Sequence, residues 1–69
     1  MVEIGNYKHY KGGEYRVINN GVLESNLQPV VIYESLSEQP PKVWVRTEED
    51  FNAMVEVDGN QVPRFKKQD

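Results

Sequence analysis

Short runs of β-branched and aromatic residues alternate along the chain with clusters of glycine, asparagine and proline. This pattern is typical of β-strands joined by tight turns. It predicts six short strands, over residues 7–11, 14–19, 30–34, 42–46, 54–57 and 61–66. Gly12-Gly13 predicts a hairpin between the first two strands, because glycine tolerates the positive φ that tight turns require. Asp58-Gly59 predicts a second hairpin between the last two strands.

The side-chain pattern within two strands indicates how each lies in the sheet. The apolar run from Val30 to Tyr33 is unbroken, which predicts a central strand covered on both faces. In the next strand, alternation puts Val43 and Val45 on one face, and Trp44 and Arg46 on the other.

The segments between strands carry their own signals. Residues 20–28 are polar and predict a loop, and residues 35–41 predict a linker whose two prolines exclude a helix. Thr47 precedes three acidic residues, which predicts a capped helix start of one or two turns. Pro63 cannot donate a ladder hydrogen bond, so the last strand is expected at an edge or with a bulge.

We expect five strands to share one core. Its members are Val17, Val31, Val45, Val57 and Phe65. Short antiparallel strands in a chain of 69 residues close most economically as a small, partly open barrel. The sequence therefore predicts an all-β fold and a single domain over residues 1–69, too small to enclose a large cofactor.

The amino-acid composition excludes several kinds of chemical site. The absence of cysteine excludes disulfides, thiolate catalysis and cysteine-type zinc sites. No run is long enough to span a bilayer and no secretory signal is visible, so a cytoplasmic protein without membrane association is expected. His9 is the only histidine, and no metal-ligand spacing surrounds it. We expect neither a metal nor a cofactor.

Charge is distributed unevenly. The net charge of −3 disfavours a general nucleic-acid-binding protein, because such proteins usually carry a basic excess. Residues 1–19 and 63–69 are rich in lysine and arginine, whereas residues 20–62 are acidic. If the two ends pair in the fold, they form a small basic face; otherwise the charges serve solubility.

Four segments resemble one bacterial family, the domain of unknown function numbered 1653. They are His9-Tyr10-Lys11-Gly12-Gly13-x-Tyr15-x-Val17, Val30-Val31-x-Tyr33, Trp44-Val45-Arg46 and Glu56-Val57-Asp58-Gly59-x-x-Val62-Pro63-Arg64-Phe65. The resemblance extends from about Gly5 to Phe65. It implies an SH3-like β-barrel and no particular activity. This chain has Thr47 where members of the family often have proline, and its linker over residues 35–41 does not follow the family pattern.

Aromatic and cationic side chains on the strands suggest a binding surface. The candidate ligand-binding residues are Tyr7, His9, Lys11, Tyr33, Trp44, Arg46 and Arg64. Aromatic rings would supply contact area, and the cations would hold a carboxylate or phosphate. The competing interpretation is structural: His9 and Trp44 pack in the core and the arginines pair with acids.

Three classes of function fit these residues. The first is a non-enzymatic binding module for an anionic or peptide ligand, with a short single-stranded nucleic acid disfavoured by the net charge. The second is a structural or regulatory subunit that docks through an edge strand. The third is an undescribed enzyme in which His9 acts as general base, although no catalytic motif is recognisable.

Overall fold

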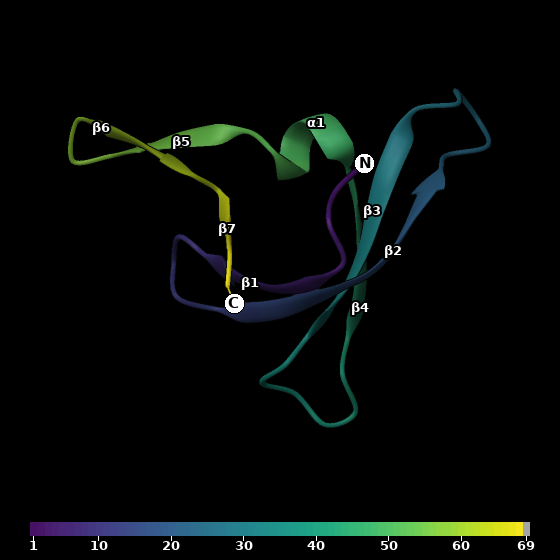
Figure 1. The fold of residues 1–69 in the computed structure, drawn as a ribbon, viewed down its shortest axis with the longest axis horizontal. Helices are drawn as coiled ribbons and strands as arrows, with labels where there is room; N and C mark the ends of the chain where they lie inside the picture. The colour runs from purple at the N-terminus through teal and green to yellow at the C-terminus, as the bar shows by residue number, and fades with distance from the viewer. Residues whose placement is uncertain (69) are drawn as a thin grey trace.

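The computed structural model describes residues 1–68 as seven β-strands and one helical turn (Figure 1). The strands are β1 (Gly5–His9), β2 (Glu14–Val22), β3 (Pro29–Ser35), β4 (Val43–Thr47), β5 (Met54–Val57), β6 (Asn60–Pro63) and β7 (Phe65–Lys67). The helical turn α1 (Glu48–Phe51) follows β4 directly. The all-β fold class is confirmed.

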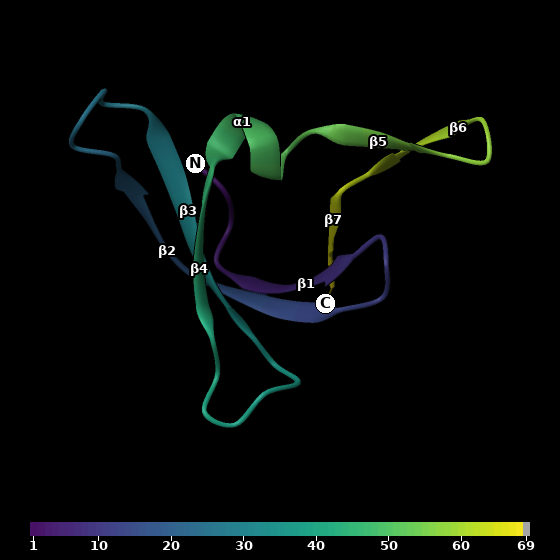
Figure 2. The ribbon, with the colours of Figure 1, turned by 180° about the vertical axis from the view of Figure 1, so that it is seen from behind.

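Five strands form one antiparallel sheet in the order β4-β3-β2-β1-β7, and β5 and β6 form a separate two-stranded ribbon. β1 and the first half of β2 run across the molecule, whereas β3 and β4 run steeply to them (Figure 1 and Figure 2). The sheet is therefore strongly coiled, and α1 lies at its concave side. This is the small, partly open barrel that the strand pattern predicts, and it agrees with the SH3-like fold that the family resemblance implies.

The turn of the first hairpin is longer than predicted. The His9 amide donates to Gly13 O and the Gly12 amide donates to His9 O, each at 2.7 Å. These bonds end β1 at His9, so the predicted strand over residues 7–11 begins earlier and stops earlier, and Lys11 lies in the turn. Gly12 has a φ of 104°, which is the conformation for which glycine was expected here.

A β-bulge bends β2. The register with β3 shifts between Val17 and Asn19, and Ile18 between them is 39% exposed. An inserted residue of this kind increases the local twist of the sheet. The bulge lets the first half of β2 pair with β1 and the second half continue along β3.

The loop prediction for residues 20–28 was wrong at its start, where residues 20–22 extend β2. The side chain of Asn20 explains the difference. It accepts from the Val2 amide and donates to Val2 O, both at 2.9 Å, which fixes the N-terminal segment against the strand. A polar residue here supports strand structure because its hydrogen bonds go to the backbone.

An aromatic-rich core fills the concave side of the sheet. Its buried members are Val2, Tyr7, Val17, Val31, Tyr33, Phe51 and Phe65. The rings of Phe51 and Phe65 stack with centroids 4.2 Å apart, and Tyr33 packs at an angle to both. The predicted core residues Val17, Val31 and Phe65 are confirmed.

The core prediction was wrong for Val45 and Val57, which are 61% and 37% exposed. In β4, Trp44 lies opposite the buried Tyr33, so its face of the strand turns toward the core and that of Val45 turns away. Val57 ends β5, and the β5–β6 ribbon projects from the rest of the molecule (Figure 1).

The second hairpin is confirmed. β5 pairs with β6 in antiparallel register, and Asp58 and Gly59 have φ values of 51° and 81°. Pro63 ends β6, which pairs only with β5 and therefore lies at an edge, as predicted.

The strand predicted over residues 61–66 is two strands. Phe65 begins β7, which leaves the ribbon and pairs with β1. Arg64 lies at the bend, where its amide donates to Ala53 O at 3.0 Å. Lys8 of β1 lies opposite Lys66 of β7, so the two basic ends of the chain do pair.

The helix start at Thr47 is confirmed. The Asp50 amide donates to Thr47 Oγ1 at 3.2 Å, and the three acids occupy the first turn. One turn is enough to carry Phe51 into the core, where it is 2% exposed. No helix among the described residues has the length and apolar character that crossing a membrane requires.

Candidate functional site

Four of the seven candidate residues meet at a small hollow on the concave face of the sheet. It is lined by His9, Tyr15, Tyr33, Trp44, Arg46 and Phe65. Its volume is about 120 Å³. Liquid water occupies about 30 Å³ per molecule, so the hollow holds about four waters. A carboxylate, a phosphoryl group or the edge of a ring fits this space.

Arg46 forms one wall and is held from three sides. Its Nε donates to Tyr33 Oη at 3.2 Å, and its Nη1 donates to Asp50 Oδ2 at 2.6 Å. Its guanidinium carbon lies 5.8 Å from the ring centre of Phe65. The hydrogen bond to Tyr33 raises the pKa of Arg46 despite partial burial, and Asp50 adds to the effect. Nη2 has no hydrogen-bond partner among the described residues and remains a donor for a ligand.

Arg64 reaches the same region through Asp50. Its Nε donates to Asp50 O at 3.1 Å, and its Nη2 lies 3.6 Å from Asp50 Oδ1. One carboxylate therefore lies between two guanidinium groups, Arg46 and Arg64. Two positive charges against one negative charge leave this corner of the site with a net positive charge.

His9 lies at the rim of the hollow, partly buried on β1. Its ring packs edge-on against Phe65 with centroids 4.9 Å apart. Burial lowers the pKa of His9, and the charges of Arg46, Arg64 and Lys11 lower it further. The imidazole is therefore mainly neutral at pH 7.

The neutral imidazole of His9 has a defined tautomer. The Lys11 amide donates to His9 Nδ1 at 3.1 Å, so Nδ1 is an acceptor and the proton resides on Nε2. His9 therefore offers an N–H donor at Nε2 rather than a lone pair.

Trp44 forms the outer wall and is 42% exposed. Lys42 lies over its ring at 5.3 Å from the centroid. The indole N–H has no hydrogen-bond partner among the described residues. As the only tryptophan in the chain, Trp44 reports on events at this hollow without interference from another indole.

Two other candidate residues lie elsewhere. Tyr7 is 7% exposed in the core, and its hydroxyl donates to Glu3 O at 2.7 Å. Burial, with a smaller contribution from Glu3, raises the pKa of its phenol. Lys11 is exposed in the first turn, with its Nζ 5.8 Å from the Tyr10 ring centre. Its side chain acts on the hollow through its charge, and its backbone amide through the hydrogen bond to His9.

Sequence reasoning missed three contributors to the site. Tyr15 was assigned only to a strand, Phe65 only to the core, and Asp50 only to the helix cap. Alternation within the second strand could have identified Tyr15, because it shares a face with Val17. No local signal could have paired Asp50 with Arg64, which is 14 positions away.

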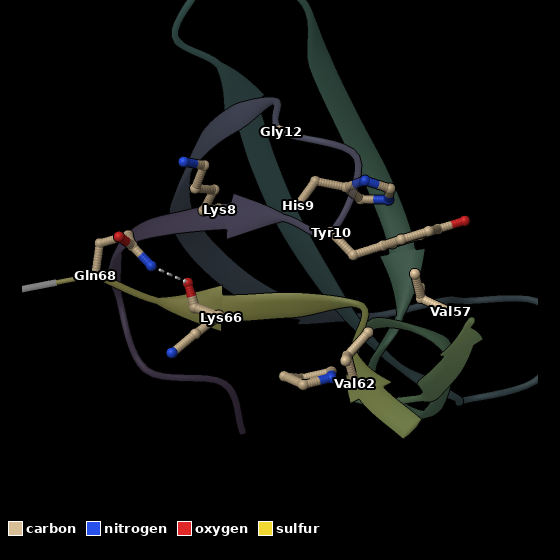
Figure 3. Close-up of a pocket in the computed structure, with 9 residues that line it drawn as sticks. Lys8, His9, Tyr10, Gly12, Val57, Val62, Lys66 and Gln68 are labelled. Carbon is tan, nitrogen blue, oxygen red and sulfur yellow. Dashed lines mark hydrogen bonds between the residues drawn. The ribbon is translucent and has the colours of Figure 1, made fainter. Parts of the chain in front are cut away.

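A larger, shallower hollow lies on the other side of His9, between β1, β7 and the β5–β6 ribbon, with a volume of about 390 Å³. Lys8 and Lys66 border one side, and Val57 and Val62 border the other (Figure 3). The Gln68 side chain donates to Lys66 O at 3.0 Å at its edge. The lysine ammonium groups lie at its border rather than around a small concavity, so this hollow offers no convergent set of donors like that of the smaller one.

No group of three or more histidine or acidic side chains among residues 1–68 could hold a metal ion. The candidate site is an arrangement of aromatic rings, two guanidinium groups and one imidazole.

Comparison with known proteins identifies the family. Residues 5–67 match the family described as a protein of unknown function, DUF1653. The chain belongs to this family. A crystal structure of a DUF1653 protein from Bordetella bronchiseptica is similar, with a TM-score of 0.87 and 25% sequence identity over 97% of this chain and 87% of that chain. No curated protein matches the sequence.

The family motifs coincide with the small hollow. Each of its six lining residues belongs to one of the four segments that carry the resemblance. These segments lie far apart in the sequence, and the fold brings their side chains together around Arg46.

Proposed function

We propose that this DUF1653 protein is a non-enzymatic binding module that takes a carboxylate or phosphoryl group of a peptide into the hollow beside Arg46. One observation carries the proposal. Donor groups on Arg46, His9 and Trp44 have no partner among the described residues, and all three side chains line an aromatic hollow of about 120 Å³. Unpaired donors around a small concavity favour an anion.

Electrostatics support an anionic ligand over a cationic one. Aromatic hollows of this kind can also bind ammonium groups. Here the chain's own Arg46 already lies over the Phe65 ring. A second cation would be repelled by Arg46 and Arg64, whose charges also lower the pKa of His9.

The remainder of the chain favours a peptide as the carrier of this anion. Residues 20–62 are acidic and the net charge is −3, which disfavours a polyanion with many phosphates. A peptide presents a single carboxylate or phosphate with little further negative charge. Trp44, at 42% exposure, then provides an aromatic surface for the adjoining residue.

Trp44 fluorescence tests the proposal. The protein is titrated with pools of phosphopeptides, of aspartate- and glutamate-containing peptides, and of the same peptides with amide side chains. We expect the anionic pools to change the emission and the amide pool not to. Added salt weakens binding, because partly exposed charges are screened over about 8–10 Å.

Variants identify the hollow as the site. Arg46→Ala is expected to weaken binding at least about tenfold, the equivalent of one charge-assisted hydrogen bond. Arg46→Lys retains the charge but not the planar fork, and should bind with intermediate affinity. Arg16→Ala removes an exposed arginine opposite Glu34 and serves as the matched control. Equal binding by the Arg46→Ala and Arg16→Ala variants would contradict the proposal, and a response to oligonucleotides alone would reassign the ligand.

An enzymatic role for His9 has less support. A general base needs a free lone pair directed at the substrate. Since Nδ1 of His9 accepts the Lys11 amide, the proton lies on Nε2, and neither nitrogen is free to accept.

A further inference from the structure

The two edges of the five-stranded sheet differ in how they are protected. β7 is three residues long and carries Lys66 and Lys67, which discourage pairing with another chain. β4, over Val43–Thr47, has no proline, no bulge and no lysine. Val43 and Val45 on its outer face are 57% and 61% exposed. Its one charged side chain, Arg46, is paired with Asp50.

The backbone groups on the free side of β4 can be assigned from its register with β3. The Ser35 amide donates to Lys42 O at 3.0 Å, so Lys42 bonds to β3. Hydrogen-bonded and non-bonded pairs alternate along an antiparallel ladder. Trp44 and Arg46 therefore also bond to β3, and the amides and carbonyls of Val43, Val45 and Thr47 point away from the sheet.

These three residues are spaced symmetrically about Val45. An antiparallel copy of β4 would place Val45 opposite the partner's Val45, and Val43 opposite the partner's Thr47. Each of these pairs would exchange both N–H···O bonds. The free edge is thus complementary to itself about a two-fold axis through Val45.

The side chains are complementary in the same register. Trp44 would lie opposite the partner's Arg46 on one face, and the exposed Val45 side chains would meet at the axis on the other. Symmetry makes the Trp44–Arg46 pair occur twice.

We infer that β4 is a homodimer interface, at which two copies of this chain join their sheets by antiparallel pairing centred on Val45. This interface is built from the backbone edge and the outer valines, but Trp44 and Arg46 border both the interface and the hollow. Association is therefore tested without ligand.

Disulfide trapping tests the register directly, because the chain contains no cysteine. In the proposed dimer the two Val45 Cα atoms are about 5.5 Å apart, within the range of about 4.4–6.8 Å that a disulfide spans. Val45→Cys should form a covalent dimer under mild oxidation. Val43→Cys is the matched control, because it has similar exposure but its two copies are separated by about 13 Å along the strands. Equal cross-linking of both variants, or of neither, would overturn the inference.

Sedimentation equilibrium of the ligand-free protein, from micromolar to millimolar concentration, provides a second test. The wild type should associate to a dimer. Val45→Lys, which places two ammonium groups opposite each other at the axis, should weaken association at least about tenfold. Val57→Lys makes the same change on the β5–β6 ribbon and should not. A wild type that stays monomeric throughout, or a Val45→Lys variant that dimerises as strongly as the wild type, would overturn the inference. Because no ligand is present, failure here leaves the anion proposal unaffected.

Discussion

Phe51 connects the single helical turn to the sheet, and its replacement tests whether the aromatic core holds the barrel together. The side chain is 2% exposed. Its ring stacks on Phe65 with centroids 4.2 Å apart, and lies edge-on to Tyr7 at 5.3 Å and to Tyr33 at 5.6 Å. Phe51→Ala therefore removes contacts to three strands at once.

The expected loss is comparable to the whole stability of the protein. A buried Phe→Ala change typically costs about 3–5 kcal/mol. A domain of 69 residues, at about 0.05–0.15 kcal/mol per residue, has a free energy of unfolding of about 3–10 kcal/mol. Phe51→Ala should therefore lose about a third or more of this stability, and at the lower end of the range it would be unfolded at 25 °C. Phe51→Leu keeps much of the volume and should lose about 1–2 kcal/mol.

Urea denaturation followed by circular dichroism and Trp44 fluorescence measures both variants. With a slope of about 1 kcal/mol per molar urea, Phe51→Leu should lower the midpoint by about 1–2 M. Met54→Ala, three positions later and 53% exposed, is the control and should change stability by less than about 0.5 kcal/mol. A Phe51→Ala variant as stable as Met54→Ala would refute the idea that this ring closes the core.

Two further stability measurements test the strand faces and the helix cap. In the same urea assay, Val31→Ala should lower the free energy of unfolding by about 1–3 kcal/mol, because Val31 is fully buried. Val45→Ala, at an exposed position, should lower it by less than about 0.5 kcal/mol. Similar losses for the two variants would contradict the observed faces of β3 and β4. Thr47→Ala should cost about 1 kcal/mol through loss of the hydrogen bond to the Asp50 amide, and Thr47→Ser should restore most of it. An unchanged midpoint for Thr47→Ala would show that the cap contributes nothing.

Local turn chemistry made much of this fold predictable. Asp58-Gly59 and Gly12-Gly13 mark backbone conformations that few other residues adopt, so both hairpins could be read from the sequence. Thr47 likewise marks a helix start because its hydroxyl satisfies a free amide.

The inward face of β4 could not be predicted in the same way. Alternation separates Val45 from Trp44 and Arg46, but both faces are partly apolar. Turning a partly buried arginine inward is costly unless its charge is paired. That pairing comes from Asp50 on the following helical turn. The face of β4 is thus decided by a tertiary contact, which no pattern within the strand reveals.

The extension of β2 to Val22 and the division of the last strand have similar causes. Asn20 reads as a loop residue, yet its side chain bonds to the Val2 backbone and continues the strand. Arg64 interrupts the last strand because its amide bonds to Ala53, outside the ladder. Both features depend on a hydrogen bond to a residue that is distant in sequence or lies in another element of the fold.

In the candidate site, some groupings follow from strand periodicity and others depend on contacts between distant residues. Strand periodicity grouped Trp44 with Arg46, but it equally grouped Tyr7 with His9, although they lie at different depths. The hollow forms at the end of β1, where the core gives way to solvent, so His9 borders it and Tyr7 does not. How deeply a strand side chain is buried depends on what packs over it, which for Tyr7 is Phe51. The periodicity of the strand does not reveal this packing.

His9 gives the protein a stability that depends on pH, with a sign that follows from its surroundings. Burial, and then the charges of Arg46, Arg64 and Lys11, lower its pKa below the ordinary value near 6.5. Between the folded and unfolded pKa values, the unfolded chain binds more protons. The free energy of unfolding therefore falls as the pH is lowered from above 6.5 toward the folded pKa, and His9 causes no further loss below it.

Proton NMR of the single imidazole measures this pKa directly. We expect a midpoint below about 6.5 in the wild type, and a higher one in Arg46→Ala because one of the nearby positive charges is gone. Arg16→Ala, on the outer surface, should leave the midpoint unchanged. The loss of stability in this pH window should disappear in His9→Gln. A wild-type midpoint at or above the ordinary histidine value would mean that Arg46 and Arg64 do not impose a positive potential on the hollow, and the electrostatic basis for an anionic ligand would fail with it.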